Sequence, residues 1–177
     1  MILELEHVLN AETLGRIRQE MRMAPSDAAT VTGAAPGRSV LPTARKSTQV
    51  AVGEAARTSV VALLEHLERR IEAHFERPLD GFEPPQFLRY RAGDFFVAHQ
   101  DGNTPLVHDD SRFRKVSVVI FLNSESEFGG GSLVLHGERS LQIEAGRLVA
   151  FPSETTHEVL PITRGERLSV ASWYRGP

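Results

Sequence analysis

The sequence contains no cysteine, one tryptophan and two tyrosines among its 177 residues. The absence of cysteine excludes disulfides, thiolate-bound zinc, iron–sulfur clusters and cysteine nucleophiles. No apolar run approaches the roughly 18 residues that a membrane-spanning helix needs. The net charge is −3 and no long block of like charge occurs, so the electrostatic footprint of a nucleic-acid-binding protein is missing. We therefore expect no membrane span and no nucleic-acid partner.

Length and composition favour a single domain. A chain of 177 residues that is 41% hydrophobic is long enough to bury one core and too short for two comfortable ones. We predict one domain over residues 1–177, with a helical front and a loop over 1–83 and a strand-rich core over 84–177. The N-terminal Met1-Ile2-Leu3-Glu4 is acidic where a signal peptide is basic, so the expected location is cytoplasmic.

Two helical patterns occupy the front of the chain. Asn10 has the side chain of an N-cap, and Leu14, Ile17 and Met21 follow it at helical spacing, which predicts a helix over about residues 11–22. An amphipathic pattern predicts a second helix over about 53–75, ended by Arg77-Pro78. The stretch 24–47 between them is rich in Ala, Gly, Pro, Ser and Thr, which favours a long loop with short edge strands.

From residue 84 onward, short apolar runs separated by Gly and Pro predict strands. The runs are 86–90, 95–99, 116–122, 132–136, 141–144, 148–151, 157–160 and 168–174. Eight strands without intervening helices favour a double-sheet jelly roll, also called a double-stranded β-helix, which can hold a ligand between its sheets. With the front helices packed on one sheet, the expected fold class is α+β.

His99-Gln100-Asp101 and the later His157 predict a metal site. Two imidazoles and one carboxylate can hold one face of an octahedral Fe(II) and leave the opposite positions open, which is a catalytic arrangement. In a strand, residues two apart point to the same side, so His99 and Asp101 can reach one metal. His157 lies 56 residues beyond Asp101 and has to be brought alongside by the fold.

Arg167 and Ser169 repeat this spacing ten residues past His157, on what we expect to be the adjoining strand. A guanidinium grips a carboxylate with two hydrogen bonds, and a hydroxyl two residues on can bind the same group. Simpler interpretations also stand: His157 as an exposed turn histidine, and Arg167 in a surface ion pair with Glu158 or Glu166.

The candidate residues lie within a longer ordered set of motifs. These are residues 90–101, which end in His99-Gln100-Asp101, then 114–123, 128–133 and 146–152, followed by His157 and Arg167-Leu168-Ser169. The set resembles the prolyl 4-hydroxylase-like 2-oxoglutarate- and Fe(II)-dependent dioxygenases. The resemblance covers about residues 84–174. The two helices and residues 43–47 are also similar to the support helices and entrance loop of that family.

The resemblance implies an oxidoreductase that binds Fe(II) through His99, Asp101 and His157 and uses 2-oxoglutarate and O2 as co-substrates. The distal carboxylate of 2-oxoglutarate would meet Arg167, helped by Ser169 and by the Tyr90 hydroxyl. Without the family, a tyrosine in a strand is more often a core residue whose hydroxyl is bonded locally. Oxidative decarboxylation to succinate and CO2 would accompany hydroxylation of an unactivated C–H bond. Ascorbate dependence, common in this family, is implied as well.

The resemblance favours a prolyl residue in a peptide or protein as substrate, with a free amino acid or small metabolite as the alternative. Two other classes stay open at this point: a cupin-type metalloenzyme that does not use 2-oxoglutarate, and a non-catalytic relative that binds peptide in the old groove. No feature of the sequence indicates the oligomeric state.

Overall fold

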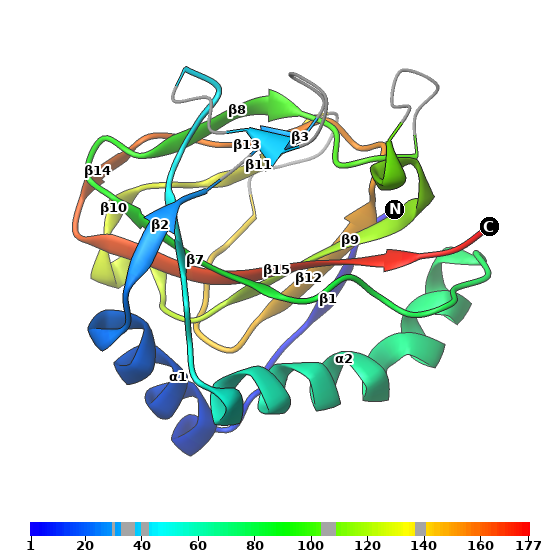
Figure 1. The fold of residues 1–177 in the computed structure, drawn as a ribbon, viewed down its shortest axis with the longest axis horizontal. Helices are drawn as coiled ribbons and strands as arrows, with labels where there is room; N and C mark the ends of the chain where they lie inside the picture. Colours follow the sequence, from blue (N-terminus) through cyan, green and yellow to red (C-terminus); the bar gives the residue numbers. More distant parts are fainter. Residues whose placement is uncertain (30, 33–37, 40–42, 104–108, 137–140) are drawn as a thin grey trace.

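A computed structural model describes residues 1–29, 31–32, 38–39, 43–103, 109–136 and 141–177. Two helices cover one face of a large antiparallel sheet, and a smaller sheet lies on its opposite face (Figure 1). The α+β jelly roll expected from the strand pattern is therefore confirmed. Neither helix of the described residues has an apolar stretch long enough to cross a bilayer.

The large sheet has the strand order β1-β12-β9-β15-β7-β6-β2. In that order its strands are Leu3–Leu5, Leu148–Pro152, Arg114–Phe121, Glu166–Arg175, Gln86–Arg91, Thr48–Val50 and Ser26–Ala28. The smaller sheet has the order β11-β13-β8-β5, with strands Leu133–Leu135, His157–Val159, Phe95–His99 and Arg45–Lys46. Two further pairs join β10 (Gly129–Gly130) to β14 (Ile162–Arg164) and β3 (Val31–Thr32) to β4 (Arg38–Ser39). Two short 3-10 helices, η1 (Asp110–Phe113) and η2 (Glu125–Glu127), flank β9.

Both helices lie within about a residue of their predicted bounds. Helix α1 (Ala11–Met23) begins where the Asn10 side chain accepts a hydrogen bond of 2.8 Å from the Thr13 N–H, as an N-cap does. Helix α2 (Glu54–Phe75) ends at Glu76, whose backbone is left-handed. The local signals of capping and amphipathic spacing are enough to place these ends.

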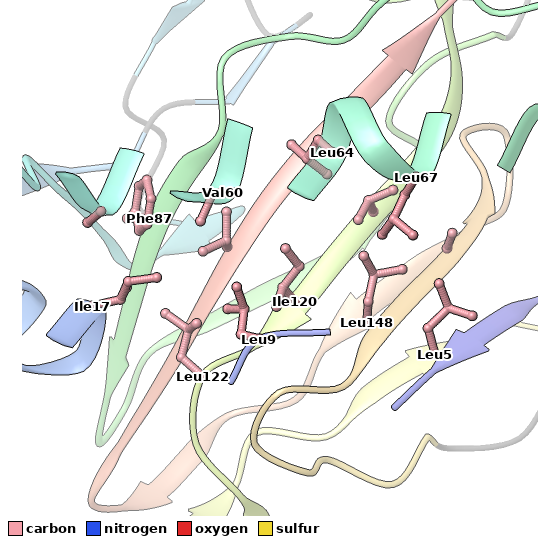
Figure 2. Close-up of a cluster of buried hydrophobic side chains, with 14 of the residues drawn as sticks. Leu5, Leu9, Ile17, Val60, Leu64, Leu67, Phe87, Ile120, Leu122 and Leu148 are labelled. Carbon is pink, nitrogen blue, oxygen red and sulfur yellow. The ribbon is translucent and has the colours of Figure 1, made fainter. Parts of the chain in front are cut away.

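The main core lies between the helices and the large sheet (Figure 2). Side chains of this core include Ile17 from α1, Val60, Leu64 and Leu67 from α2, and Phe87, Ile120 and Leu148 from the sheet. Strand β9 shows how the two faces differ, since Val118 and Ile120 join this core while Phe121 joins the core on the other face. The period-two alternation leaves one face of the large sheet free to face the smaller sheet.

The structure corrects one predicted strand. Residues 141–144 form no strand; Leu141 and Ile143 are instead buried in the core on the smaller-sheet side. A short apolar run indicates burial as well as a strand, and these residues are buried without forming a strand. The stretch 24–47 holds the edge strands β2 and β5, while residues 30, 33–37 and 40–42 of the predicted loop lie outside the described residues. The division into a front over 1–83 and a core over 84–177 stays a prediction.

Candidate active site

The structure brings His99, Asp101 and His157 together in the smaller sheet and the segment that follows it. His99 ends β8 and His157 begins β13, and the two residues are direct partners across that antiparallel pair. Asp101 lies just past β8, with Oδ1 3.4 Å from His99 Nε2 and Oδ2 3.5 Å from His157 Nε2. One ligand atom from each residue lies within 4.8 Å of the others. We call these three residues the histidine wall.

Backbone carbonyls orient both imidazoles. His99 Nδ1 lies 2.8 Å from the Val97 carbonyl oxygen and His157 Nδ1 lies 2.9 Å from that of Thr155. A carbonyl only accepts, so each Nδ1 carries a proton, and in a neutral imidazole Nε2 then keeps its lone pair. Phe96 also stacks on His99, with ring centroids 3.5 Å apart. The two Nε2 atoms are thus presented as metal ligands normally are.

Buried groups hold Asp101 in place. The Ser117 hydroxyl donates to Asp101 Oδ2 at 2.7 Å and lies 3.0 Å from the Ser153 hydroxyl, and the Asp101 N–H donates to the Ser153 carbonyl at 2.9 Å. The next residue is Gly102, where a Cβ would lie 2.0 Å from the Ser111 carbonyl oxygen. The close packing after the carboxylate therefore requires glycine.

The protonation states suit a metal ion. Burial alone would raise the pKa of Asp101, but the His157 and His99 imidazoles and the Ser117 hydroxyl hold that pKa well below its usual range. Burial lowers the pKa of His157 below its ordinary value. The wall is therefore one carboxylate with neutral imidazole at His157, and divalent metals bind these forms.

Arg167 lies on β15 of the large sheet, not on a strand adjoining His157. Strands β13 and β15 belong to different sheets: β15 pairs with β7 and β9, whereas β13 pairs with β8 and β11. The predicted side-by-side placement is wrong; the two sets of residues instead line one pocket from different sheets. Consecutive strands of a jelly roll commonly cross between sheets, and strand spacing alone does not reveal the crossing.

Arg167, Ser169 and Tyr90 form what we call the arginine wall. Arg167 is only 2% exposed, its Nη1 donates to Ser169 Oγ at 3.1 Å, and its guanidinium carbon lies 5.2 Å from the centre of the Tyr90 ring. The Arg167 Nε has no hydrogen-bond partner, and no carboxylate of the described residues forms an ion pair with this side chain. A cation buried without a counter-ion is costly, which points to an anionic ligand.

Burial lowers the pKa of Arg167, yet a guanidinium keeps its charge in proteins. The simpler interpretations, His157 as an exposed turn histidine and Arg167 in a surface ion pair, are wrong. His157 is 6% exposed and so is not an exposed turn histidine, and Glu166 pairs with Arg22 rather than with Arg167.

The pocket between the walls has a cavity volume of about 50 Å³ and opens to solvent. Leu88, Leu133 and Val159 supply apolar lining, and Arg45 and Trp173 line it as well. Trp173 was not among the predicted site residues, although the sequence spacing could have indicated it. It lies on the same face of β15 as Arg167 and Ser169, because alternate residues of a strand point to one side. Ser117 has no such signal, because a serine in an apolar strand is unremarkable.

A polar cluster ties together the two segments that carry the histidine wall. Glu154 forms an ion pair with Arg77 and accepts a hydrogen bond of 3.2 Å from the Asn103 amide. The Gln100 amide donates to the Glu154 carbonyl at 2.6 Å. These contacts tie residues 100–103, which include Asp101, to Glu154 in the segment that leads to His157.

Comparison with known proteins defines the class. Residues 85–175 match the 2OG-Fe(II) oxygenase superfamily. A PKHD-type hydroxylase of Shewanella sp. strain MR-7 is 30% identical over 98% of this chain and 77% of its own length. The chain therefore belongs to the 2OG-Fe(II) oxygenase superfamily, and it is an oxidoreductase.

Solved structures agree with this assignment. A prolyl-4-hydroxylase of Pseudomonas putida is 27% identical, with a TM-score of 0.76 over 99% of this chain and 92% of that one. A prolyl hydroxylase of Trichoplax adhaerens, in complex with a peptide fragment of the hypoxia inducible factor oxygen degradation domain, shares the fold with a TM-score of 0.73 at 17% identity. That fold covers 98% of this chain and 83% of the Trichoplax protein.

The residues present fit the metal and co-substrate that the family implies. The histidine wall offers two oriented imidazole nitrogens and one charged carboxylate, the donor set of non-haem Fe(II) oxygenases. The arginine wall offers a buried cation whose charge is not balanced by a carboxylate of the described residues. A dicarboxylate that reaches from one wall to the other would satisfy both. Membership of this superfamily favours an enzyme that uses 2-oxoglutarate over the cupin-type alternative without it.

Proposed function

We propose that this protein hydroxylates an unactivated C–H bond of a prolyl residue in a peptide or protein. The overall reaction converts the substrate, 2-oxoglutarate and O2 to the hydroxylated product, succinate and CO2. The observation that carries the proposal is one pocket with a candidate three-residue metal site on one wall and, on the other, a buried guanidinium that has no carboxylate partner among the described residues. When bound, Fe(II) and 2-oxoglutarate would supply the electrons that activate O2, which is the oxidant in this chemistry.

In this proposal, His99, Asp101 and His157 hold the iron. Their preset orientation reduces the rearrangement needed on binding, because the Nδ1 atoms and one Asp101 oxygen already have hydrogen-bond partners. Ser117 keeps Asp101 in place through its hydroxyl.

Arg167 binds the distal carboxylate of 2-oxoglutarate through N–H groups at the edge of its guanidinium, where Nε has no acceptor among the described residues. Ser169 and Tyr90 lie beside that guanidinium and assist through their hydroxyls. The apolar lining excludes water from this pair, which strengthens the charge-assisted hydrogen bonds.

Trp173 and Phe96 add aromatic surface to the pocket lining. The Phe96 ring contacts both the His99 ring and the Arg45 guanidinium, whose carbon lies 4.7 Å from the ring centre. Two comparisons support a prolyl substrate: the Pseudomonas putida structure is that of a prolyl-4-hydroxylase, and the Trichoplax enzyme holds a peptide in the same fold. A requirement for ascorbate, which keeps such iron reduced, is part of the proposal.

The test is incubation with Fe(II), 2-oxoglutarate, ascorbate and O2 against two libraries, proline-containing peptides and free amino acids. We expect a mass gain of one oxygen atom on peptides, with succinate formed in equal amount. Product in the amino-acid library alone would move the proposal to small-molecule substrates. Absence of 2-oxoglutarate binding to the Fe(II)-loaded protein would overturn it.

A further inference from the structure

Strand β15 loses its β9 partner close to Arg167. The β9 to β15 ladder ends at the pair of Phe121 with Ser169, and the Leu122 N–H then donates to the Leu168 carbonyl at 2.9 Å. From there the chain turns away towards η2. The backbone on either side of Arg167 therefore lacks a neighbouring strand on this edge.

A side chain takes the place of that strand. Asn123 Oδ1 accepts a hydrogen bond of 2.9 Å from the Leu168 N–H, and Asn123 Nδ2 donates one of 2.8 Å to the Glu166 carbonyl. Asn123 is 1% exposed. One planar amide thus ties the residues directly before and after Arg167, while β7 pairs with the opposite edge through Tyr90.

The Arg167 side chain has few other constraints. Its single hydrogen bond within the described residues is to Ser169, its Nε has no partner, and aromatic rings lie beside it rather than acceptors. On one side it packs closely on Gly131, where a Cβ would lie 3.3 Å from Arg167 Cδ. The direction of a long side chain with few contacts depends on the backbone that carries it.

Among small side chains, only an amide meets both backbone groups. An aspartate of the same shape would offer two acceptors and so place an oxygen against the Glu166 carbonyl. A serine is too short to reach both groups, and an apolar residue would leave both unpaired in the interior. The chemistry of the two partners therefore explains asparagine at this position.

We propose that Asn123 is a positioning residue for Arg167, which aims the guanidinium at the distal carboxylate of 2-oxoglutarate. This inference rests on the proposed function, in which Arg167 binds that carboxylate. Asn123 does not line the pocket and acts only through the β15 backbone.

Calorimetric titration of the Mn(II)-loaded protein separates this role from a general effect on the fold. Two ligands are compared: 2-oxoglutarate, and 2-oxobutanoate, which keeps the keto acid but lacks the distal carboxylate. For Asn123→Asp and Asn123→Ser we expect the Kd of 2-oxoglutarate to rise about tenfold, as the loss of a buried hydrogen bond allows. The Kd values of 2-oxobutanoate and of Mn(II) should change less than about twofold.

Ser172→Ala is the matched control, because Ser172 is equally buried on β15 and donates one hydrogen bond to a carbonyl, that of Glu83. It should bind both ligands like the wild type. Arg167→Met separates the positioning role of Asn123 from the proposed function. If Arg167→Met loses 2-oxoglutarate affinity but both Asn123 variants keep it, the positioning role is wrong and the proposed function stands.

If Arg167→Met itself binds 2-oxoglutarate like the wild type, the proposed function is wrong. If the Asn123 variants lose Mn(II) affinity as well, or no longer fold, Asn123 is a determinant of the fold and the positioning role is overturned.

Discussion

The two walls of the pocket differ in how well the protein itself satisfies their polar groups. On the histidine wall, both Nδ1 atoms bond to carbonyls and Asp101 accepts from Ser117. On the arginine wall, Arg167 is more deeply buried yet has one hydrogen bond and no carboxylate partner within the described residues. The first wall is preorganised before a ligand arrives, and the second becomes satisfied only when an anion binds. The walls should therefore respond differently to mutation.

The largest effect is expected from removing a metal-ligating side chain of the histidine wall. Loss of a residue that only supports a metal ligand lowers metal affinity roughly 10- to 100-fold. Asp101→Ala removes a ligand itself, so it should lower the affinity for Mn(II) or Fe(II) by more than that. Calorimetric titration of the metal measures this. His136→Ala is the control, because His136 is an exposed histidine paired with Glu158. Equal metal affinity in Asp101→Ala and the wild type would remove Asp101 from the site.

The arginine wall should show the opposite balance between binding and stability. Arg167→Met should raise the Kd of 2-oxoglutarate about 100-fold, because a charge-assisted hydrogen-bonded pair is lost, and leave metal affinity unchanged. The free protein should melt at the same temperature or higher, since an apolar side chain replaces a buried cation that has no counter-ion in the described part of the chain.

Thermal unfolding with and without metal and 2-oxoglutarate tests both the loss of 2-oxoglutarate binding and the unchanged or higher stability of the free protein. Added 2-oxoglutarate should raise the Tm of the metal-loaded wild type and not that of Arg167→Met. Arg164→Met, at an exposed arginine of β14, is the control. A large drop in the Tm of ligand-free Arg167→Met would contradict the contrast between the walls.

An intermediate effect is expected at Ser117. Ser117→Ala leaves the donor set intact but frees one oxygen of Asp101, so metal affinity should fall about tenfold. Ser117→Thr keeps the hydroxyl and should retain most of the affinity. Metal titration measures both, and equal losses in the two variants would mean that packing rather than the hydroxyl matters.

The smallest effect concerns the cluster around Glu154. The pKa of Glu154 lies below its ordinary value: burial opposes this, but the hydrogen bond from Arg77 and the other contacts outweigh it. A lowered folded-state pKa stabilises the protein above the ordinary carboxyl pKa, and that stability is lost as the pH falls through the folded value. Both side chains are about a third exposed, so the contribution should be about 0.5 kcal/mol.

Urea unfolding of the wild type and Glu154→Gln measures this contribution. We expect the wild type to be slightly more stable at pH 7, with the difference shrinking on acidification. A difference that grows at low pH would contradict the sign.

Local features and the candidate metal-ligating residues could be predicted from the sequence. The spacing of His99 and Asp101 and the cap at Asn10 depend on neighbours in the chain, and capping geometry appears in the structure as expected. The sheet that carries Arg167 could not be predicted, because it depends on which strands cross between sheets. Ser117 and Asn123 were missed for a similar reason: their partners, Asp101 and the β15 backbone, are distant in sequence.

The central claim is that one ligand joins the two walls, with its keto acid at the histidine wall and its distal carboxylate at the arginine wall. Anaerobic titration of 2-oxoglutarate into the Fe(II)-loaded protein, followed by the metal-to-ligand charge-transfer absorption, tests it directly. The wild type should develop the band at low 2-oxoglutarate concentration, Arg167→Met only at about 100-fold higher concentration, and His157→Ala not at all. A band that forms in Arg167→Met at the wild-type concentration, or no band in the wild type, would contradict the claim.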